Sequence, residues 1–238
     1  TQPEYRDYLY GQLSSVDRQI MHRSIVNILE TSFPDFYDRD MMLEYHYAQC
    51  GDRLNAFRHR VNDLVFYISN AHELFRSQYG RKEFEQATDL QIQHIIAEAE
   101  NTLNQLCLAH VDSSQLDEIR NMILYIQATY GTSTGHYTIS LPAIHELLFH
   151  CGKRSNLCII AHRQMANYAI QIGNTDLLKE HINAGQACAM SQGSDREYAV
   201  LERYRGLLYI MEGNYPQARE TLHRSLELTD QAYAPGIS

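Results

Sequence analysis

Histidines and cysteines between positions 145 and 162 have the types and spacing closest to those of a metal site. His145 and His150 enclose Glu146 in the segment His-Glu-Leu-Leu-Phe-His. A zinc-protease helix needs its two histidines four residues apart, so that both lie on one helix face. A spacing of five puts these two about 140° apart on a helix with ~3.6 residues per turn. The segment therefore predicts no catalytic zinc.

Cys151, Cys158 and His162 form a second candidate set of ligands, because Cys158 and His162 share one helix face at a spacing of four residues. The sequence contains no Cys-x-x-Cys pair that would complete a structural zinc site. The five cysteines are odd in number and scattered through apolar stretches, which favours small buried side chains in a reducing compartment. We therefore predict no metal ligand in this chain.

Nucleotide and hydrolase motifs are also missing from the sequence. Gly152-Lys153-Arg154-Ser155 lacks the upstream glycine of a phosphate-binding loop, and no Gly-x-Ser-x-Gly elbow occurs. We predict a non-catalytic chain with no cofactor of its own. A helical enzyme, which would need a deep pocket with titrating groups buried together, is a weaker alternative.

The composition limits the partners that this chain can bind. The 238 residues carry a net charge of −9 and 44% hydrophobic residues. An acidic balance argues against contact with nucleic acid, which requires a basic face. No apolar run approaches the length of a membrane span, and no secretory leader is visible. We predict a cytoplasmic protein, and we interpret the chain, which begins at Thr1, as a piece of a longer one.

Helical periodicity runs through the sequence, and strand signals are nearly absent. Ser14 with Asp17 and Ser194 with Glu197 have the spacing of a capping box, in which side chains satisfy the first amides of a helix. Asp52, after Gly51, can cap in the same way. The predicted helices cover residues 15–31, 38–50, 53–78, 83–110, 115–131, 137–150, 156–172, 175–190, 196–212 and 216–230.

Four glycine turns separate these helices and recur at a regular distance. The turns begin at Gly51, Gly135, Gly173 and Gly213, which are separated by 84, 38 and 40 residues. A period near 40 is typical of stacked helical hairpins, each of which buries its apolar face only against its neighbours. We predict an all-α fold, a right-handed superhelix (solenoid) of antiparallel hairpins with about ten helices.

The last of these turns lies in a hairpin with a recognisable pattern of small and large residues. Gly206 is small where two helices must approach, Ala218 is small on the facing helix, and Leu222 fills the core beyond. With Tyr209 and Gly213-Asn214-Tyr215, this pattern resembles the tetratricopeptide repeat. The resemblance implies a single helical-repeat domain over 1–238, with irregular repeats in 1–114 and three regular tetratricopeptide-like repeats in 115–230.

The amino-terminal half carries a second resemblance. Residues 13–25, then Leu29-Glu30, Leu43 to Asp52 with its Tyr-His-Tyr, and Ala56-Phe57 resemble a junction in large bacterial signal-transduction ATPases. In these MalT-like, LuxR-type and SARP-type regulators, a winged-helix region meets a helical-repeat sensor. The resemblance implies that an ATP-binding module lies upstream and that a DNA-binding module lies elsewhere in the parent protein.

The first helix of each pair would line the inner groove of such an array. We expect this groove to bind a protein, a peptide or a small anionic metabolite, because an arginine pair can fork to a carboxylate and an asparagine can hold a peptide backbone. Ordinary Arg–Glu pairing on a solvated face, with Glu197 or Glu202, is the alternative. The candidates for the groove are Tyr45, Tyr125, Thr129, Arg163, Asn167, Arg203, Leu207 and Ile210.

The function that follows is a non-catalytic sensor or protein-interaction domain of a bacterial transcription regulator. Binding in the groove would favour one packing of the stack and so bias the upstream ATPase. A pure adaptor, including one that forms a homo-oligomer, is the main alternative. A peptide-pheromone receptor of the helical-repeat type is another.

Overall fold

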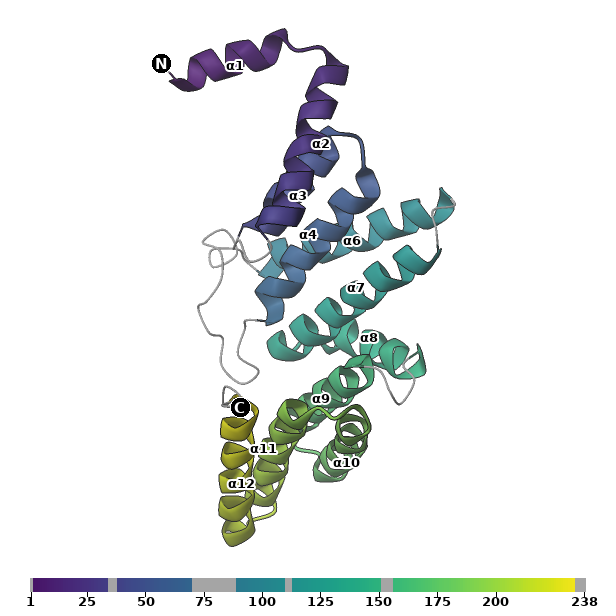
Figure 1. Cartoon of the computed structure of the whole chain (residues 1–238). Coiled ribbons are helices and arrows are strands. Elements are labelled where there is room, and N and C mark those ends of the chain that lie inside the picture. Colours follow the sequence, from purple (N-terminus) through teal and green to yellow (C-terminus); the bar gives the residue numbers. More distant parts are fainter. Residues whose placement is uncertain (1, 34–37, 70–88, 110–112, 151–155, 234–238) are drawn as a thin grey trace. The chain divides into compact units, whose positions relative to one another are not determined.

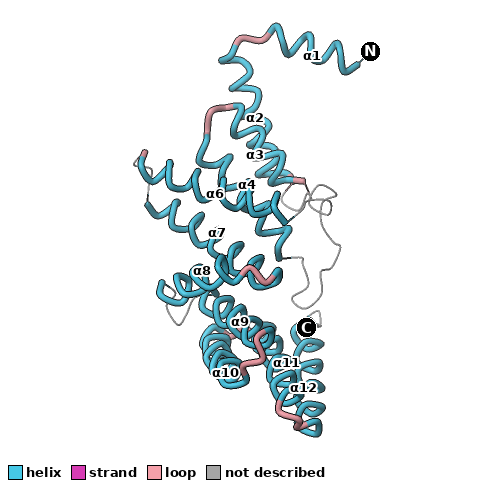
Figure 2. The backbone as a smooth tube through the Cα atoms, turned by 180° about the vertical axis from the view of Figure 1, so that it is seen from behind, coloured by secondary structure: helices cyan, strands magenta, loops and turns pink. Residues whose placement is uncertain are grey.

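The computed structural model describes residues 2–33, 38–69, 89–109, 113–150 and 156–233. These residues form helices and no strand, which confirms the predicted all-α fold (Figures 1 and 2). None of their helices has both the length and the apolar character needed to cross a membrane. The eleven helices of the described residues are α1 (Gln2–Gln12), α2 (Ser15–Ser32), α3 (Arg39–Gln49), α4 (Arg53–Ser69), α6 (Asp89–Leu108), α7 (Ser113–Thr134), α8 (Tyr137–His150), α9 (Asn156–Gln171), α10 (Thr175–Gln192), α11 (Asp195–Met211) and α12 (Tyr215–Tyr233).

Most of the predicted helix boundaries agree with these within two or three residues. Residues 70–78 and 83–88, which the prediction made helical, lie outside the described residues. Helix α1 was not predicted, because its apolar side chains do not form a buried stripe. Tyr5, Tyr8 and Leu9 are all exposed on it.

The described helices belong to two compact units. The amino-terminal unit contains α1 to α6 and the first half of α7, up to Met122, and the carboxy-terminal unit contains the rest of α7 and α8 to α12. The division falls inside α7, eight residues beyond the predicted change at 114/115. The assignment of one repeat domain, and the handedness of a superhelix, stay predictions.

Each predicted glycine turn has the backbone geometry that a helix stop requires. Gly173 has φ +70, in the left-handed region where a side chain is disfavoured, and the next residue, Asn174, accepts a hydrogen bond from the backbone amide of Leu177 at 3.0 Å. The pair therefore ends α9 and begins α10. Gly51, Gly135 and Gly213 have the same backbone sign, and so does Gly193, which the period did not identify.

Two of the predicted caps are formed, and one is not. Ser14 accepts a hydrogen bond from the amide of Asp17, and Asp52 accepts one from Asn55. The capping box at Ser194 is wrong, because its side chain makes no capping hydrogen bond. The carboxylate of Glu197, its expected partner, instead accepts a hydrogen bond from Arg163 in α9.

The helices of the carboxy-terminal unit pack against their neighbours along the chain, as α9 to α12 show in Figure 1. Helix α9 contributes to two core clusters. Ala161 and Met165 pack with α7 and α8, whereas Ile159 and Ala166 pack with α10 and α11. A helix that is buried on both sides in this way is typical of stacked hairpins.

The last hairpin has the close approach predicted from its small residues. A Cβ added at Gly206 in α11 would lie 2.6 Å from Leu222 Cγ in α12, and Ala218 is buried. The amino-terminal unit has its own core between α2, α3 and α4, with Val26, Leu43 and Ala56 at its centre. In the carboxy-terminal unit Ala218 is buried as its spacing predicted, whereas on α2 Leu29 is buried but Ile20 and Ile28, expected on the same apolar stripe, are exposed.

Candidate functional site

The predicted groove residues of the carboxy-terminal unit lie on α7, α9 and α11. Asn167 is buried, with 3% of its surface exposed. Leu207 is half-buried and packs against the core cluster of α9, α10 and α11. Tyr125 and Arg203 are half-buried and make contacts of their own within the protein. These side chains thus contact other residues of the protein, and they are less exposed than side chains that line an open ligand groove.

Two polar contacts link these three helices. Gln164 Nε2 in α9 donates to Thr129 Oγ1 in α7 at 3.2 Å. Arg163 Nη1 in α9 donates to Glu197 Oε2 in α11 at 3.0 Å, with both side chains mostly buried. Arg163 therefore has the carboxylate partner that the alternative of ordinary Arg–Glu pairing expected.

Tyr45 lies in the amino-terminal unit, and 53% of it is exposed. Its ring makes edge contacts with His22 and His46, and the Nδ1 atoms of these two histidines are 2.7 Å apart. Tyr10 Oη lies 2.9 Å from Nε2 of His22. Burial lowers the pKa of both histidines, and His22 lowers the pKa of His46 further. This cluster binds α1, α2 and α3 together.

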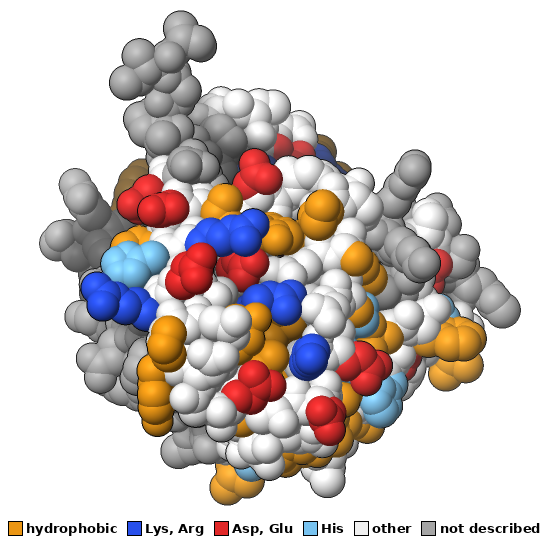
Figure 3. All heavy atoms as spheres, turned by 90° about the horizontal axis from the view of Figure 1, so that it is seen from below, with side chains coloured by type: hydrophobic (Ala, Val, Ile, Leu, Met, Phe, Trp, Pro, Cys, Tyr) orange, Lys and Arg blue, Asp and Glu red, His pale blue; other side chains and the backbone are white. Residues whose placement is uncertain are grey.

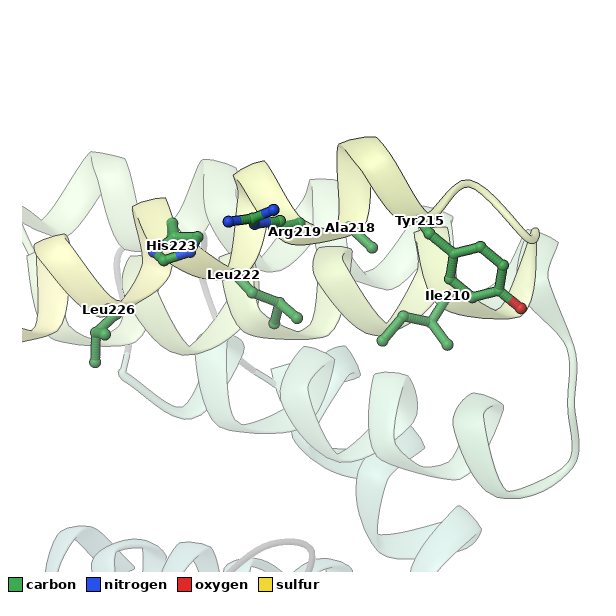
Figure 4. Close-up of a pocket in the computed structure, with 7 residues that line it drawn as sticks. All are labelled: Ile210, Tyr215, Ala218, Arg219, Leu222, His223 and Leu226. Atoms are coloured by element: carbon green, nitrogen blue, oxygen red, sulfur yellow. The ribbon is translucent and has the colours of Figure 1, made fainter.

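A shallow apolar groove of about 430 Å³ lies along the last hairpin and differs from the predicted one. We call it the α12 groove (Figure 4). Ile210 is the one member that the sequence had suggested. The lining residues are Ile210 of α11 and Tyr215, Ala218, Arg219, Leu222, His223 and Leu226 of α12.

The side chains of the α12 groove form a stripe on the helix. Positions 215, 218, 222 and 226 recur every three or four residues, which is the spacing of a single helix face, and 219 and 223 lie next to them. Figure 4 shows Ile210, Leu222 and Leu226 directed to the same side of the hairpin. Tyr215 is 68% exposed and Leu226 is 58% exposed. The sequence pattern predicts packing positions for Ala218 and Leu222 alone, and Ala218 is buried as predicted.

Charged side chains of both signs lie among apolar ones on the face of the molecule that Figure 3 presents. That face is not a patch of a single charge.

A separate cluster of possible metal ligands joins α9 and α10. Cys158 Sγ, Cys188 Sγ and a ring nitrogen of His162 all lie within 4.8 Å of one another. No other group of three such side chains occurs in the part of the chain that the structure describes. Cys151 lies outside the described residues, and His145 and His150 are both exposed on α8.

His162 has a second histidine beside it. Its Nδ1 is 2.9 Å from Nδ1 of His181 in α10. Burial, and then the neighbouring His181, lower the pKa of His162 to about 4, so the ring is neutral near pH 7. The sequence spacing suggests Cys158 and His162 as possible ligands but not Cys188. The contact between Cys188 and Cys158 joins two helices of the hairpin and has no signal in the local sequence.

The fold and these sites define an all-α protein built of packed helical hairpins, with a shallow apolar groove along its last hairpin. No protein-family model matches the chain, and no solved structure matches it. The resemblance to the regulator junction therefore stays a prediction from residues 13–57.

Proposed function

We propose that this chain is a non-catalytic helical-repeat module that binds an amphipathic helix of a partner protein in the α12 groove. The observation that carries the proposal is the shallow apolar groove that runs from Tyr215 to Leu226, with these two end residues exposed. It extends over about three helical turns, or roughly 16 Å at ~1.5 Å per residue. Helix-in-groove recognition uses anchors at this spacing.

The charges beside the stripe favour an acidic partner helix. Arg219 and His223 lie within the groove lining, one turn apart, in a chain whose net charge is −9. A partner with glutamates on the borders of its apolar stripe would pair with Arg219. Such pairs set orientation and the rate of association more than they set affinity.

The packing inside the carboxy-terminal unit supplies a precedent for this mode of binding. Helix α11 packs on α9 and α10 through Leu201, Tyr204 and Leu208, which are buried and three or four residues apart. The α12 groove offers the next surface of the same kind. A helix from a partner would continue the stacking by which each hairpin covers its neighbour.

The contacts of Arg163 weigh against the alternative of a peptide or small anionic ligand in the predicted groove. Such a ligand would have to displace Glu197, which accepts a hydrogen bond from Arg163 at 3.0 Å. We therefore favour a protein partner, in keeping with the adaptor alternative.

The resemblance of residues 13–57 to the regulator junction suggests the kind of parent protein to which this module belongs. We propose that the module belongs to the sensor region of a bacterial transcription regulator with an ATP-binding module elsewhere in the parent protein. Partner binding would then shift the population of one packing of the repeats. The residues between 13 and 57 that carry the resemblance support this setting.

A peptide-binding experiment tests the groove. The probe is a synthetic helix of about 15 residues, long enough to span the groove, with a leucine stripe bordered by glutamates. Fluorescence anisotropy should detect binding to the whole chain. Leu226→Asp should weaken binding tenfold or more, which corresponds to about 1.4 kcal/mol, because it places a charge in the apolar contact.

Arg224→Glu is the matched control, because Arg224 is exposed on the same helix but does not line the groove. It should leave the affinity within about twofold, whereas Arg219→Glu should weaken binding and reduce its dependence on salt. Equal affinity of the wild type and Leu226→Asp would contradict the proposed site. Self-association that Leu226→Asp abolishes would make a second copy of this chain the occupant instead.

A further inference from the structure

Helices α9 and α10 bring two thiols and an imidazole to one point. Cys158 and His162 lie one turn apart on α9, and Cys188 faces them from α10. The Sγ atoms of the two cysteines are 2.6 Å apart, so they would have to separate by about 1 Å to bind one tetrahedral ion with Zn–S bonds of ~2.3 Å. The three ligand atoms lie within 4.8 Å of one another, which is a span that one ion can bridge after small movements.

The approach of the two helices is fixed by the backbone. A Cβ added at Gly185 in α10 would lie 3.2 Å from Cβ of His162 and 2.9 Å from Cδ1 of Leu201. The absence of a side chain at Gly185 lets α10 lie directly against α9 at His162. Cys188, one turn further along α10, is thereby held opposite Cys158.

The surroundings of the cluster fit an ion with soft ligands. Cys158 is 5% exposed and Cys188 is 6% exposed, and both belong to an apolar core cluster. Buried charge is costly unless it is paired. Two thiolates balance the charge of one Zn²⁺ ion, so a zinc-bound cluster is neutral overall. Thiolate and imidazole are also the ligands that zinc prefers in proteins.

We propose that Cys158, Cys188 and His162 bind one Zn²⁺ ion between α9 and α10, with water in the fourth position. Binding converts both thiols to thiolates and releases two protons to solvent. His181, hydrogen-bonded to His162, acts as a positioning residue that fixes the orientation of the ligating ring. The ion cross-links the α9–α10 hairpin on which α11 packs. This inference does not depend on the α12 groove.

Cobalt substitution tests the site in the whole chain, reduced and freed of metal with a chelator. Co²⁺ titration should produce a thiolate-to-cobalt charge-transfer band that saturates at one ion per chain, and Zn²⁺ should abolish the band. Cys158→Ser and Cys188→Ser should each lose it, as should His162→Gln. Cys107→Ser is the control and should keep it, because Cys107 is a half-buried cysteine outside the cluster.

His181→Gln separates positioning from ligation. The charge-transfer band should persist in this variant, while Zn²⁺ affinity falls about 10- to 100-fold, as for other residues that orient a ligand. Unchanged Zn²⁺ affinity in His181→Gln would overturn the role of His181.

Thiol alkylation gives a readout that requires no variant to fold. Because both thiols are buried, the chain is labelled with iodoacetamide at a urea concentration that partly unfolds it. Zn²⁺ should slow the alkylation of Cys158 and Cys188 there and leave Cys50 and Cys107 reactive, as peptide mass spectrometry would show. The site is overturned if the charge-transfer band never forms or if alkylation is the same with and without Zn²⁺. It is also overturned if freshly purified protein contains a Cys158–Cys188 disulfide and no metal.

Discussion

At the scale of single residues, the paired histidines of the amino-terminal unit predict a dependence of stability on pH. Burial lowers the pKa of His22 and of His46 in the folded chain, whereas the unfolded chain has values near 6.5. Below about pH 6.5 the unfolded state therefore binds protons that the folded state does not. The stability from this pair is complete above that pH and is lost as pH falls through the lower folded values.

Thermal unfolding between pH 7.5 and pH 5 measures this effect. His46→Gln should make the decrease in melting temperature smaller, because one of the two depressed groups is gone. The groups that contact the pair are the rings of Tyr10 and Tyr45, and Arg18 lies over the Tyr10 ring at 4.8 Å. His94 is the control, since its side chain is 74% exposed, and His94→Gln should retain the wild-type slope. An identical slope in His46→Gln would exclude the pair as the cause.

At the scale of elements, the α11–α12 hairpin should be sensitive to one methyl group. In Gly206→Ala, the added Cβ would lie 2.6 Å from Leu222 Cγ, so the leucine or the helix must move. Overpacking of this kind costs about 1–3 kcal/mol, measurable by urea unfolding. Gly11→Ala in α1 should not destabilise the chain and should gain up to about 1 kcal/mol of helix propensity, because no atom lies within 4 Å of its added Cβ.

A double variant distinguishes a clash at Gly206 from a general weakening of α11. Leu222→Ala removes the atoms that the new methyl group would meet. The cost of Gly206→Ala in that background should fall by about 1 kcal/mol or more, since contacting residues do not contribute additively. Strict additivity of the two changes would show that the close contact with Leu222 is not what makes Gly206 necessary.

Most elements were predictable because their determinants are local in the sequence. Asn174 caps α10 from one position after a glycine, and the amphipathic stripes define α9 to α12. The features that the sequence did not predict correctly depend on contacts between different helices. Glu197 accepts a hydrogen bond from Arg163 of another helix and does not complete the predicted capping box. Cys188 lies next to Cys158 only because α10 packs antiparallel against α9. Sequence periodicity gives the face on which a residue lies, but not the residue that faces it from another helix.

The candidate site shows the same division between local and non-local information. The stripe of the α12 groove follows from helical spacing, but its exposure does not, because a buried stripe and an open one have the same pattern in the sequence. The predicted groove residues were placed by register from the glycines. Their contacts, such as Gln164 with Thr129, depend on how far α7 lies from α9.

At the scale of the whole molecule, the division inside α7 predicts which fragments fold. Leu124 and Ala128, in the second half of α7, are buried in a core cluster with Ile144 and Leu147 of α8. Leu116 and Ile119, in its first half, are buried in the amino-terminal unit. Residues 123–238 should therefore form a helical fragment that unfolds cooperatively on heating, as followed by circular dichroism.

A fragment of residues 137–238 lacks α7 altogether and should be less stable. Loss of the Leu124 contact alone removes the burial of one leucine, about 2 kcal/mol. For a fragment of this size that lowers the melting temperature by roughly 10 °C. The core clusters around α10 and α11 remain in both fragments, so their helical content should differ by little more than the α7 residues. Equal melting temperatures would mean that the second half of α7 does not belong to the carboxy-terminal core, and the boundary would then lie after Thr134.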